Sequence, residues 1–377
     1  MTQINTASMN IQSSPIQHIK RINELDFLKC IGIILVVIGH VDCPQKLHDL
    51  IYYVHMPLFF MLSGCTNKED QYYASVGNLK AFFIKRIKSI YLPFLYYSLP
   101  IILLHNVFYN LGMYSSGYTL TQYIVQVGRT FLFSIGTSEP LLGQFWFLKA
   151  LFIAEIIYSI FVFLAFKINI SKWVVILPIS FFALFVDLDL IPHSLVIYFF
   201  IPFRALLYYS VGSYFVNIVN KRTGKWFLIL SVLGCILWIF FSLYNVLKVD
   251  SFVSIHSAYG ISSFLQLYAT VSVFIILWRI THYINETNIL YKTCLVVGRM
   301  SMPIFAFHYL FVKLLSYFIA DFYYHDIQMI SNVLCLSVIP WYVYTIVGVS
   351  FSILLYKVLF ILKKYIVYRY KLFCIIK

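Results

Sequence analysis

Long apolar runs alternate with short polar segments along the whole chain. Each run is nearly free of charge, and roughly 20 mostly apolar residues are what an α-helix needs to cross a bilayer. The pattern therefore predicts an all-α polytopic membrane protein with about ten transmembrane helices. The expected spans are residues 25–41, 50–65, 87–105, 145–166, 173–186, 195–218, 226–246, 259–280, 302–319 and 330–361.

The segments outside these spans are few. Residues 1–19 are polar and rich in Ser, Asn and Gln, which predicts a flexible cytoplasmic tail. The first apolar run follows a basic cluster without a small-residue cleavage site, so we expect an uncleaved helix. Residues 20–365 are expected to form one transmembrane domain, and 366–377 a basic cytoplasmic tail. The long outer loop, 106–144, contains a half-apolar stretch expected at the membrane surface.

The positions of the basic residues predict the orientation. With the N-terminus inside, most of the 28 Lys and Arg residues fall on the inner side. Acidic residues gather in the outer loops. This asymmetry follows the positive-inside rule and predicts an even number of spans with both termini cytoplasmic. The exceptions are Lys46, Arg129 and Lys248 in outer loops, and Lys149, Arg204 and Lys313 within spans.

Composition supports the membrane class. Hydrophobic residues make up 61% of the chain, and charged residues 11%, against about 25% in soluble domains. The mean hydropathy is +0.84. The net charge of +14 lies in short clusters between apolar runs, which speaks against nucleic acid as a partner. Seven Cys residues without metal-ligand spacing predict neither a zinc site nor a disulfide framework.

Ionisable residues inside spans are costly and therefore mark candidate functional sites. Lys29 and His40 are eleven residues apart, which places them on one helix face about 16 Å apart along the axis. His55 lies near the outer end of the second span, just before Pro57. Structural alternatives exist for each: Lys29 can snorkel to the headgroups, His40 can simply end its helix, and His55 can be a hydrogen-bonded core residue.

Further candidates lie in later spans. Arg86 and Lys88 open the third span, either as positive-inside anchors or as a clamp for phosphates. Trp146 begins the fourth span, where it can also serve as an aromatic belt residue. The remaining candidates are two intramembrane cations and a histidine: Lys149, Arg204 and His308.

Several motifs occur in one order along the chain. They are Lys29, a ten-residue gap and His40; the run HMPLFFMLSG from His55; Lys85-Arg86-Ile87-Lys88 with Pro93; Phe145-Trp146-Phe147-Leu148; and Gly298-Arg299-Met300-Ser301 through His308. Together they resemble the integral-membrane acyltransferase 3 family. Many members have Arg where this chain has Lys29, which preserves the charge but not the bidentate fork.

The resemblance implies an O-acyltransferase in the bacterial inner membrane. It would move an acyl group, with acetyl expected, from cytoplasmic acyl-CoA to a hydroxyl of a cell-surface glycan or its lipid-linked precursor. Acyl-CoA would be a co-substrate, with no tightly bound cofactor and no metal. Histidine suits a general base at neutral pH. The expected base is His40, with His55 and His308 as secondary candidates, and the expected substrate-binding residues are Lys29, Arg86, Lys88, Trp146, Lys149 and Arg204.

A transporter or flippase of lipid-linked sugars or polysaccharide is the alternative. It would have the same helices, and its buried charges would line a path rather than carry out chemistry. The absence of a detectable internal repeat weighs against many secondary transporters. The sequence does not specify the sugar, the hydroxyl position or the oligomeric state.

Overall fold

A computed structural model describes residues 21–69, 75–133, 139–186, 191–192, 195, 199–219, 225–244 and 261–376. These residues form helices and loops and contain no β-strand. The N-terminal tail expected over 1–19 lies outside the described residues.

The helices follow one another along the chain with short connections between most of them. In order they are α1 (Asn23–Gly39), α2 (Gln45–Tyr52), α3 (His55–Cys65), α4 (Val76–Arg86), the π-helix η2 (Ile87–Tyr91), α5 (Leu92–Leu103), α6 (His105–Asn110), α7 (Leu120–Phe131), the 3₁₀-helix η3 (Pro140–Phe145), α8 (Trp146–Lys167), α9 (Trp173–Phe185), α11 (Ile201–Val219), α12 (Lys225–Leu243), α14 (Ile261–Thr281), α15 (Ile289–Arg299), α16 (Ser301–Ile319), the π-helix η6 (Ala320–Tyr324), the 3₁₀-helix η7 (Ile327–Ile330) and α17 (Trp341–Ile376).

The all-helical membrane class is confirmed, and the number of spans is matched in part. Five helical segments in the described part of the chain are long and apolar enough to cross a membrane. Each falls within or overlaps one of the ten predicted spans, while α9, with 13 residues, is a shorter apolar helix. The five are Pro140–Lys167, Lys225–Leu243, Ser262–Thr281, Ser301–Tyr324 and Trp341–Ile366.

Two predicted spans have different boundaries in the structure. The second span is interrupted, because α2 ends at Tyr52 and α3 begins at His55. Pro57 fits the first turn of α3, where its missing N–H has no intrahelical role. The last span was expected from residue 330, but α17 begins only at Trp341, directly after Pro340. It then continues to Ile376, so the expected boundary between 365 and 366 lies inside this helix.

Two further helical segments differ from the predicted pattern. The third span was expected from residue 87, but α4, η2 and α5 follow one another without a break from Val76. The helix α15 was not predicted, because its 11 residues are too few and too polar to be recognised as a span.

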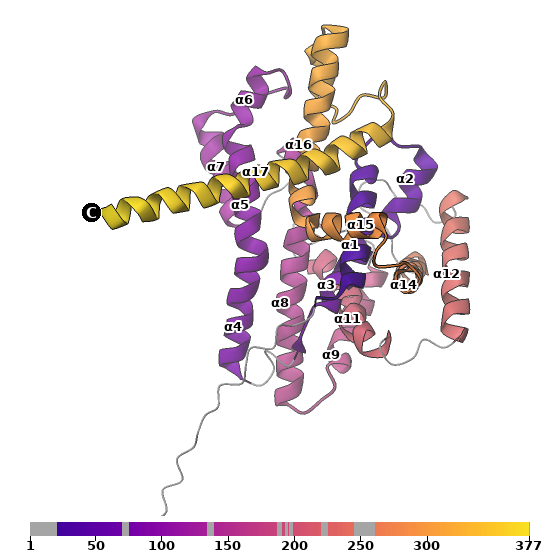
Figure 1. Ribbon diagram of the computed structural model, residues 1–377. Helices are drawn as coiled ribbons and strands as arrows, with labels where there is room; N and C mark the ends of the chain where they lie inside the picture. Colours follow the sequence, from indigo (N-terminus) through magenta and orange to yellow (C-terminus); the bar gives the residue numbers. More distant parts are fainter. Residues whose placement is uncertain are drawn as a thin grey trace, which may run out of the picture.

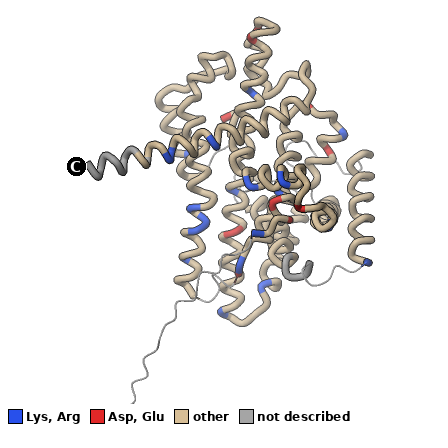
Figure 2. Tube along the Cα trace, viewed as in Figure 1, with Lys and Arg blue, Asp and Glu red and all other residues tan. Residues whose placement is uncertain are grey.

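The helix α1 lies at the centre of the bundle, where it packs against α3, α15, α16 and α17 (Figure 1). By contrast, α12 lies at the edge and contacts α14 and α2. Only 17% of the residues in its most apolar stretch are buried. Lys225, at its start, is the single charged residue of this helix (Figure 2). This exposed apolar surface suits contact with lipid.

The helices α3 and α11 cross so closely that their backbones touch. A Cβ atom on Gly64 would lie 2.0 Å from the carbonyl oxygen of Tyr209, and one on Gly212 would lie 2.0 Å from that of Met61. Small residues permit such close helix contacts in membranes. This crossing fixes α3, whose first residue is the candidate His55.

Candidate active site

His40 lies where three helices meet. It is the C-cap of α1, and its Nδ1 atom is 2.9 Å from the hydroxyl of Tyr309 on α16 and 3.3 Å from that of Tyr52 on α2. Its ring lies against His308 with the ring centroids 5.5 Å apart. The structure therefore brings two of the predicted histidines together from opposite ends of the chain.

His308 is fully buried, and its tautomer is fixed by the backbone. Its Nδ1 atom lies 3.0 Å from the carbonyl oxygen of Ile304 and 2.9 Å from that of Phe305. Carbonyl oxygens only accept hydrogen bonds, so Nδ1 carries the proton and Nε2 keeps its lone pair. Nε2 is buried and has no hydrogen-bond partner among the described residues.

Gln144 is a second buried residue with an unpartnered acceptor. Its Nε2 donates to the carbonyl oxygens of Leu141, at 3.2 Å, and Phe305, at 3.4 Å, while its Oε1 has no partner in the described part of the chain. Gln144 and His308 thus donate to the same carbonyl of Phe305. Buried polar atoms are normally paired, so these two free acceptors suit a hydrogen-bond donor that arrives with a substrate.

Gln144 was not among the site residues predicted from the sequence. The one sequence feature that could have indicated a role for Gln144 is its position directly before the motif that begins at Phe145. The tertiary contact with Phe305, 161 residues away, gives it a place in the site.

His55 is buried at the start of α3, one aromatic ring away from His40. Its Nδ1 donates to the carbonyl oxygen of Ile51 at 2.9 Å, and its ring meets the edge of Tyr52 with centroids 4.8 Å apart. Tyr52 in turn reaches His40. All three predicted histidines therefore belong to one cluster, with His55 on its periphery.

A cavity of about 280 Å³, called the inner cavity below, lies between α1, α3, η2, α8 and α16. Lys29 and three serines (Ser63, Ser89 and Ser301) are its polar lining residues, and most of the others are apolar. Lys29, Ile33 and Val36 line it from successive turns of α1, and His40 follows one turn later on the same face. Lys29 therefore marks one end of a cavity that runs toward His40.

Neither Arg86 nor Lys88 lines the inner cavity, and the two side chains have different surroundings. The Nε atom of Arg86 is 3.0 Å from the Glu155 carboxylate on α8, and its guanidinium lies over the ring of Phe82. Arg86 is thus engaged with a buried carboxylate. Lys88 is exposed and, with Lys85 and Ser89, lines a surface cavity of about 380 Å³. Ser89 also lines the inner cavity, so Lys88 lies beside its mouth.

The remaining candidates lie on α8 and α11. Trp146 is half-buried at the start of α8 and meets Phe147, which lines the inner cavity. Lys149 is buried about one turn deeper. Arg204 donates to the carbonyl oxygens of Ala183 and Val186, at 2.8 and 2.7 Å, and thereby closes the end of α9. It does not line the inner cavity.

The described helices thus bring His40 and His308 into ring contact near a cavity that Lys29 lines from the same helix as His40. The chain belongs to the acyltransferase 3 family, whose acyltransferase domain model matches residues 22–357. The protein is therefore a membrane acyltransferase, which confirms the resemblance of its motifs. No curated protein and no solved structure is significantly similar to it.

Proposed function

We propose that this acyltransferase moves an acyl group, with acetyl as the first candidate, from cytoplasmic acyl-CoA to a hydroxyl of a cell-surface glycan or its lipid-linked precursor. The proposed setting is the bacterial inner membrane, as the resemblance to the family implies, with both termini cytoplasmic, as the charge distribution favours. The observation that carries the proposal is the His40–His308 pair beyond the apolar end of a cavity whose other end holds Lys29.

The inner cavity suits the thioester arm of the donor. Its apolar walls fit an extended chain, while Lys29 at one end and Lys88 beside the mouth supply positive charge. Lysine is a common phosphate ligand in proteins. In this arrangement the phosphates stay at the cytoplasmic side and the acyl carbon reaches the histidines. Arg86 contributes by holding Glu155, so we assign it a positioning role.

His40 is the proposed general base. When Nδ1–H donates to the oxygen of Tyr309, the Nε2 atom of His40 is free to take a proton. It removes the proton of the acceptor hydroxyl as the oxygen attacks the thioester carbonyl carbon. The carbon–sulfur bond then breaks, and the CoA thiolate takes the proton back from His40. The products are the ester and the free thiol.

His308 and Gln144 are proposed to hold the reacting groups. Nε2 of His308 and Oε1 of Gln144 are acceptors that a substrate hydroxyl or amide N–H can satisfy. Lys149 remains a proposed stabiliser of the oxyanion, because a cation in a low-dielectric site is effective there. Trp146 is proposed to shape the cavity through Phe147. Arg204 serves the fold through α9.

Purified protein, labelled acetyl-CoA and de-O-acylated glycan from the producing cells test the proposal. We expect His40→Ala to lower transfer per molecule by at least about 100-fold, since removing a general base typically costs 10²–10⁴-fold. His48→Ala is the matched control, because His48 stacks on Tyr52 at 3.9 Å but is not part of the histidine pair. Equal turnover in both variants would refute the role of His40. A deletion strain that loses surface glycan rather than its acyl groups would indicate the transporter alternative.

A further inference from the structure

A second cavity, called the outer cavity below, has a volume of about 420 Å³ and is linked to His40 through Tyr309. Its walls come from the loop after α6, the start of η3, the outer half of α16 and the loop after η7. Tyr309 lines it, and the same residue forms the 2.9 Å contact with His40. Among its lining residues are Ser115, Tyr118, Lys313 and Asn332.

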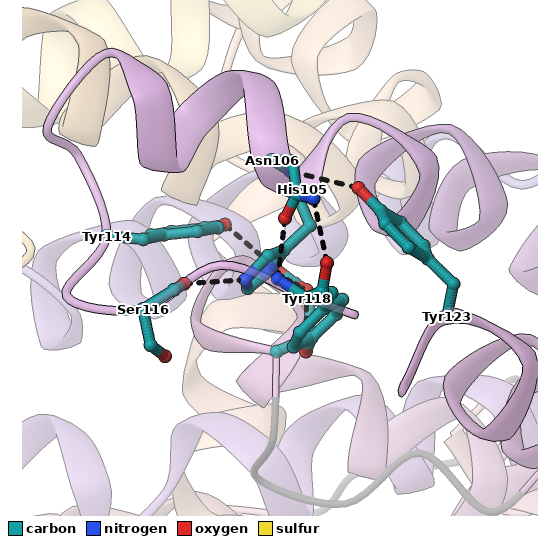
Figure 3. A network of polar contacts seen from close by, with 7 residues as sticks. His105, Asn106, Tyr114, Ser116, Tyr118 and Tyr123 are labelled. Carbon is teal, nitrogen blue, oxygen red and sulfur yellow. Dashed lines mark hydrogen bonds and ion pairs between the residues drawn. The ribbon is translucent and has the colours of Figure 1, made fainter. Parts of the chain in front are cut away.

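One wall of this outer cavity is fixed by a buried polar network (Figure 3). His105 donates from Nε2 to the Ser116 carbonyl oxygen at 3.0 Å, and its Nδ1 is 2.8 Å from Oε2 of Glu139. Tyr114 and Tyr118 both donate to the Glu139 carboxylate, at 2.6 and 3.2 Å. Burial raises the pKa of Glu139, and the hydrogen bonds from Tyr114, His105 and Tyr118 oppose this change.

Asn106 ties the same loop to α6. Its side chain donates to the carbonyl oxygen of Tyr118 at 2.8 Å and accepts from the backbone N–H of Tyr118 at 2.6 Å. The ring of Tyr118 lies parallel to that of His105, with centroids 3.4 Å apart. The loop therefore presents Ser115, Ser116 and Tyr118 to the cavity in one conformation.

The opposite wall is held equally firmly. Lys313 is buried, and its Nζ donates to the carbonyl oxygens of Ile330 and of Val333, the latter at 2.6 Å. The hydroxyl of Ser316 donates to the carbonyl oxygen of Leu334 at 3.0 Å. Loops fixed by buried side chains on both sides make this cavity a preorganised site rather than a chance gap between helices.

The two cavities follow each other along one face of α16. Ser301 and Phe305 line the inner cavity, and Tyr309 and Lys313 line the outer one. These four residues are spaced by four, so they project from one side of the helix. The segment that contains η3 and α8 lines the same two cavities in the opposite chain direction, since Leu141 lines the outer cavity and Phe147 the inner one. Gln144 lies between them.

We propose that the outer cavity is the acceptor site and that it binds a hydroxyl-rich sugar unit of the glycan, with Tyr309 linking the cavity to His40. This inference rests on the proposed function. The lining suits a sugar because it combines an aromatic ring, Tyr118, with short hydroxyl and amide side chains such as Ser115 and Asn332. Its volume lies in the range of ligand pockets, about 300–1,000 Å³.

The test fills the cavity from both walls and measures binding without the donor. Ser115→Trp and Asn332→Trp place a large side chain in the cavity, and both positions are exposed, so the fold tolerates them. Ser337→Trp is the matched control, because Ser337 is exposed on the same loop as Asn332 but does not line the cavity. De-O-acylated glycan from the producing cells is titrated into each purified protein, and acetyl-CoA consumption is measured in parallel.

We expect the dissociation constant for the glycan to rise at least about tenfold in both cavity variants and to stay within about twofold in the control. The Michaelis constant for acetyl-CoA should not change. Glycan binding that is equal in all three variants, or absent in the unaltered protein, would overturn the assignment of the cavity. Glycan binding without any acetyl-CoA consumption would instead overturn the proposed function and leave the binding site in place.

Discussion

The hydroxyl of Tyr309 lies 2.9 Å from Nδ1 of His40, although the two residues are 269 positions apart. The contact joins the C-terminal end of α1 to the middle of α16. It also places one side chain against both the proposed base and the outer cavity. Tyr309 therefore links His40 to the outer cavity, and we expect it to orient the His40 ring.

Replacing Tyr309 by Phe tests this relationship. We expect Tyr309→Phe to lower kcat about 10- to 100-fold with little change in the Michaelis constant for acyl-CoA, because partners that fix a catalytic residue typically contribute on this scale. Tyr52→Phe is the matched control and should have a smaller effect, since its hydroxyl lies 3.3 Å from the same nitrogen. A larger loss in Tyr52→Phe would assign the orienting role to Tyr52 instead.

Gln144 should show opposite effects on activity and stability. Gln144→Leu removes a buried acceptor that has no partner among the described residues and two long hydrogen bonds, of 3.2 and 3.4 Å. We expect turnover to fall about tenfold or more while the thermal midpoint stays equal or rises, because functional sites often reduce stability. Turnover and thermal unfolding are measured on the same preparation. A lower midpoint with normal turnover per molecule would indicate a structural role alone.

The ion pair of Arg86 and Glu155 should govern stability more than donor binding. Arg86→Ala leaves a carboxylate that is only 2% exposed without its cation, a change that costs about 3–5 kcal/mol in buried pairs. Adding Glu155→Gln should restore much of the lost stability. The stabilities of Arg86→Ala and of the double variant are measured by thermal unfolding in detergent.

Lys88 provides the contrast to Arg86. Because Lys88 is exposed beside the mouth of the inner cavity, Lys88→Ala should keep stability and raise the Michaelis constant for acyl-CoA. If Arg86→Ala with Glu155→Gln is stable and still has a strongly raised Michaelis constant, Arg86 binds the donor directly.

The crossing of α3 and α11 should tolerate no side chain. Gly64→Ala or Gly212→Ala would place a Cβ atom 2.0 Å from a backbone oxygen, so the helices must separate. We expect the amount of folded protein in the membrane to fall severalfold. Gly128→Ala is the control, because a Cβ there meets nothing within 4 Å, and Ala favours a helix over Gly by roughly 0.5–1 kcal/mol. Normal levels of Gly64→Ala would show that this crossing is not required.

Accessibility of single cysteines tests the orientation. Ser115, beside the outer cavity, should be labelled from outside intact cells by a membrane-impermeant maleimide as Ser115→Cys. Ser171, in the loop between α8 and α9, should be labelled as Ser171→Cys only after the membrane is opened. The positive-inside distribution is the physical reason. The reverse pattern would invert the proposed sides of donor and acceptor.

The membrane class and the family could be predicted from the amino-acid sequence. Apolar run length and the order of short motifs are local properties, so they can be read without knowing which helices touch. Because run length is a local property, it also misplaced the boundaries of two predicted spans. The break between α2 and α3 lies just before Pro57, and α17 starts directly after Pro340, and run length does not register the restraint that a proline places on the start of a helix.

Which candidate side chains are already engaged by other groups could be read only from the folded chain. Sequence spacing placed Lys29 and His40 on one face, but it did not show that Arg86 is engaged by Glu155 or Arg204 by the end of α9. It gave no reason to choose Gln144, whose neighbour in the site is 161 residues away. The physical reason is that a hydrogen bond or an ion pair depends on atoms meeting within about 3 Å, and such meetings between distant segments exist only once the helices have packed.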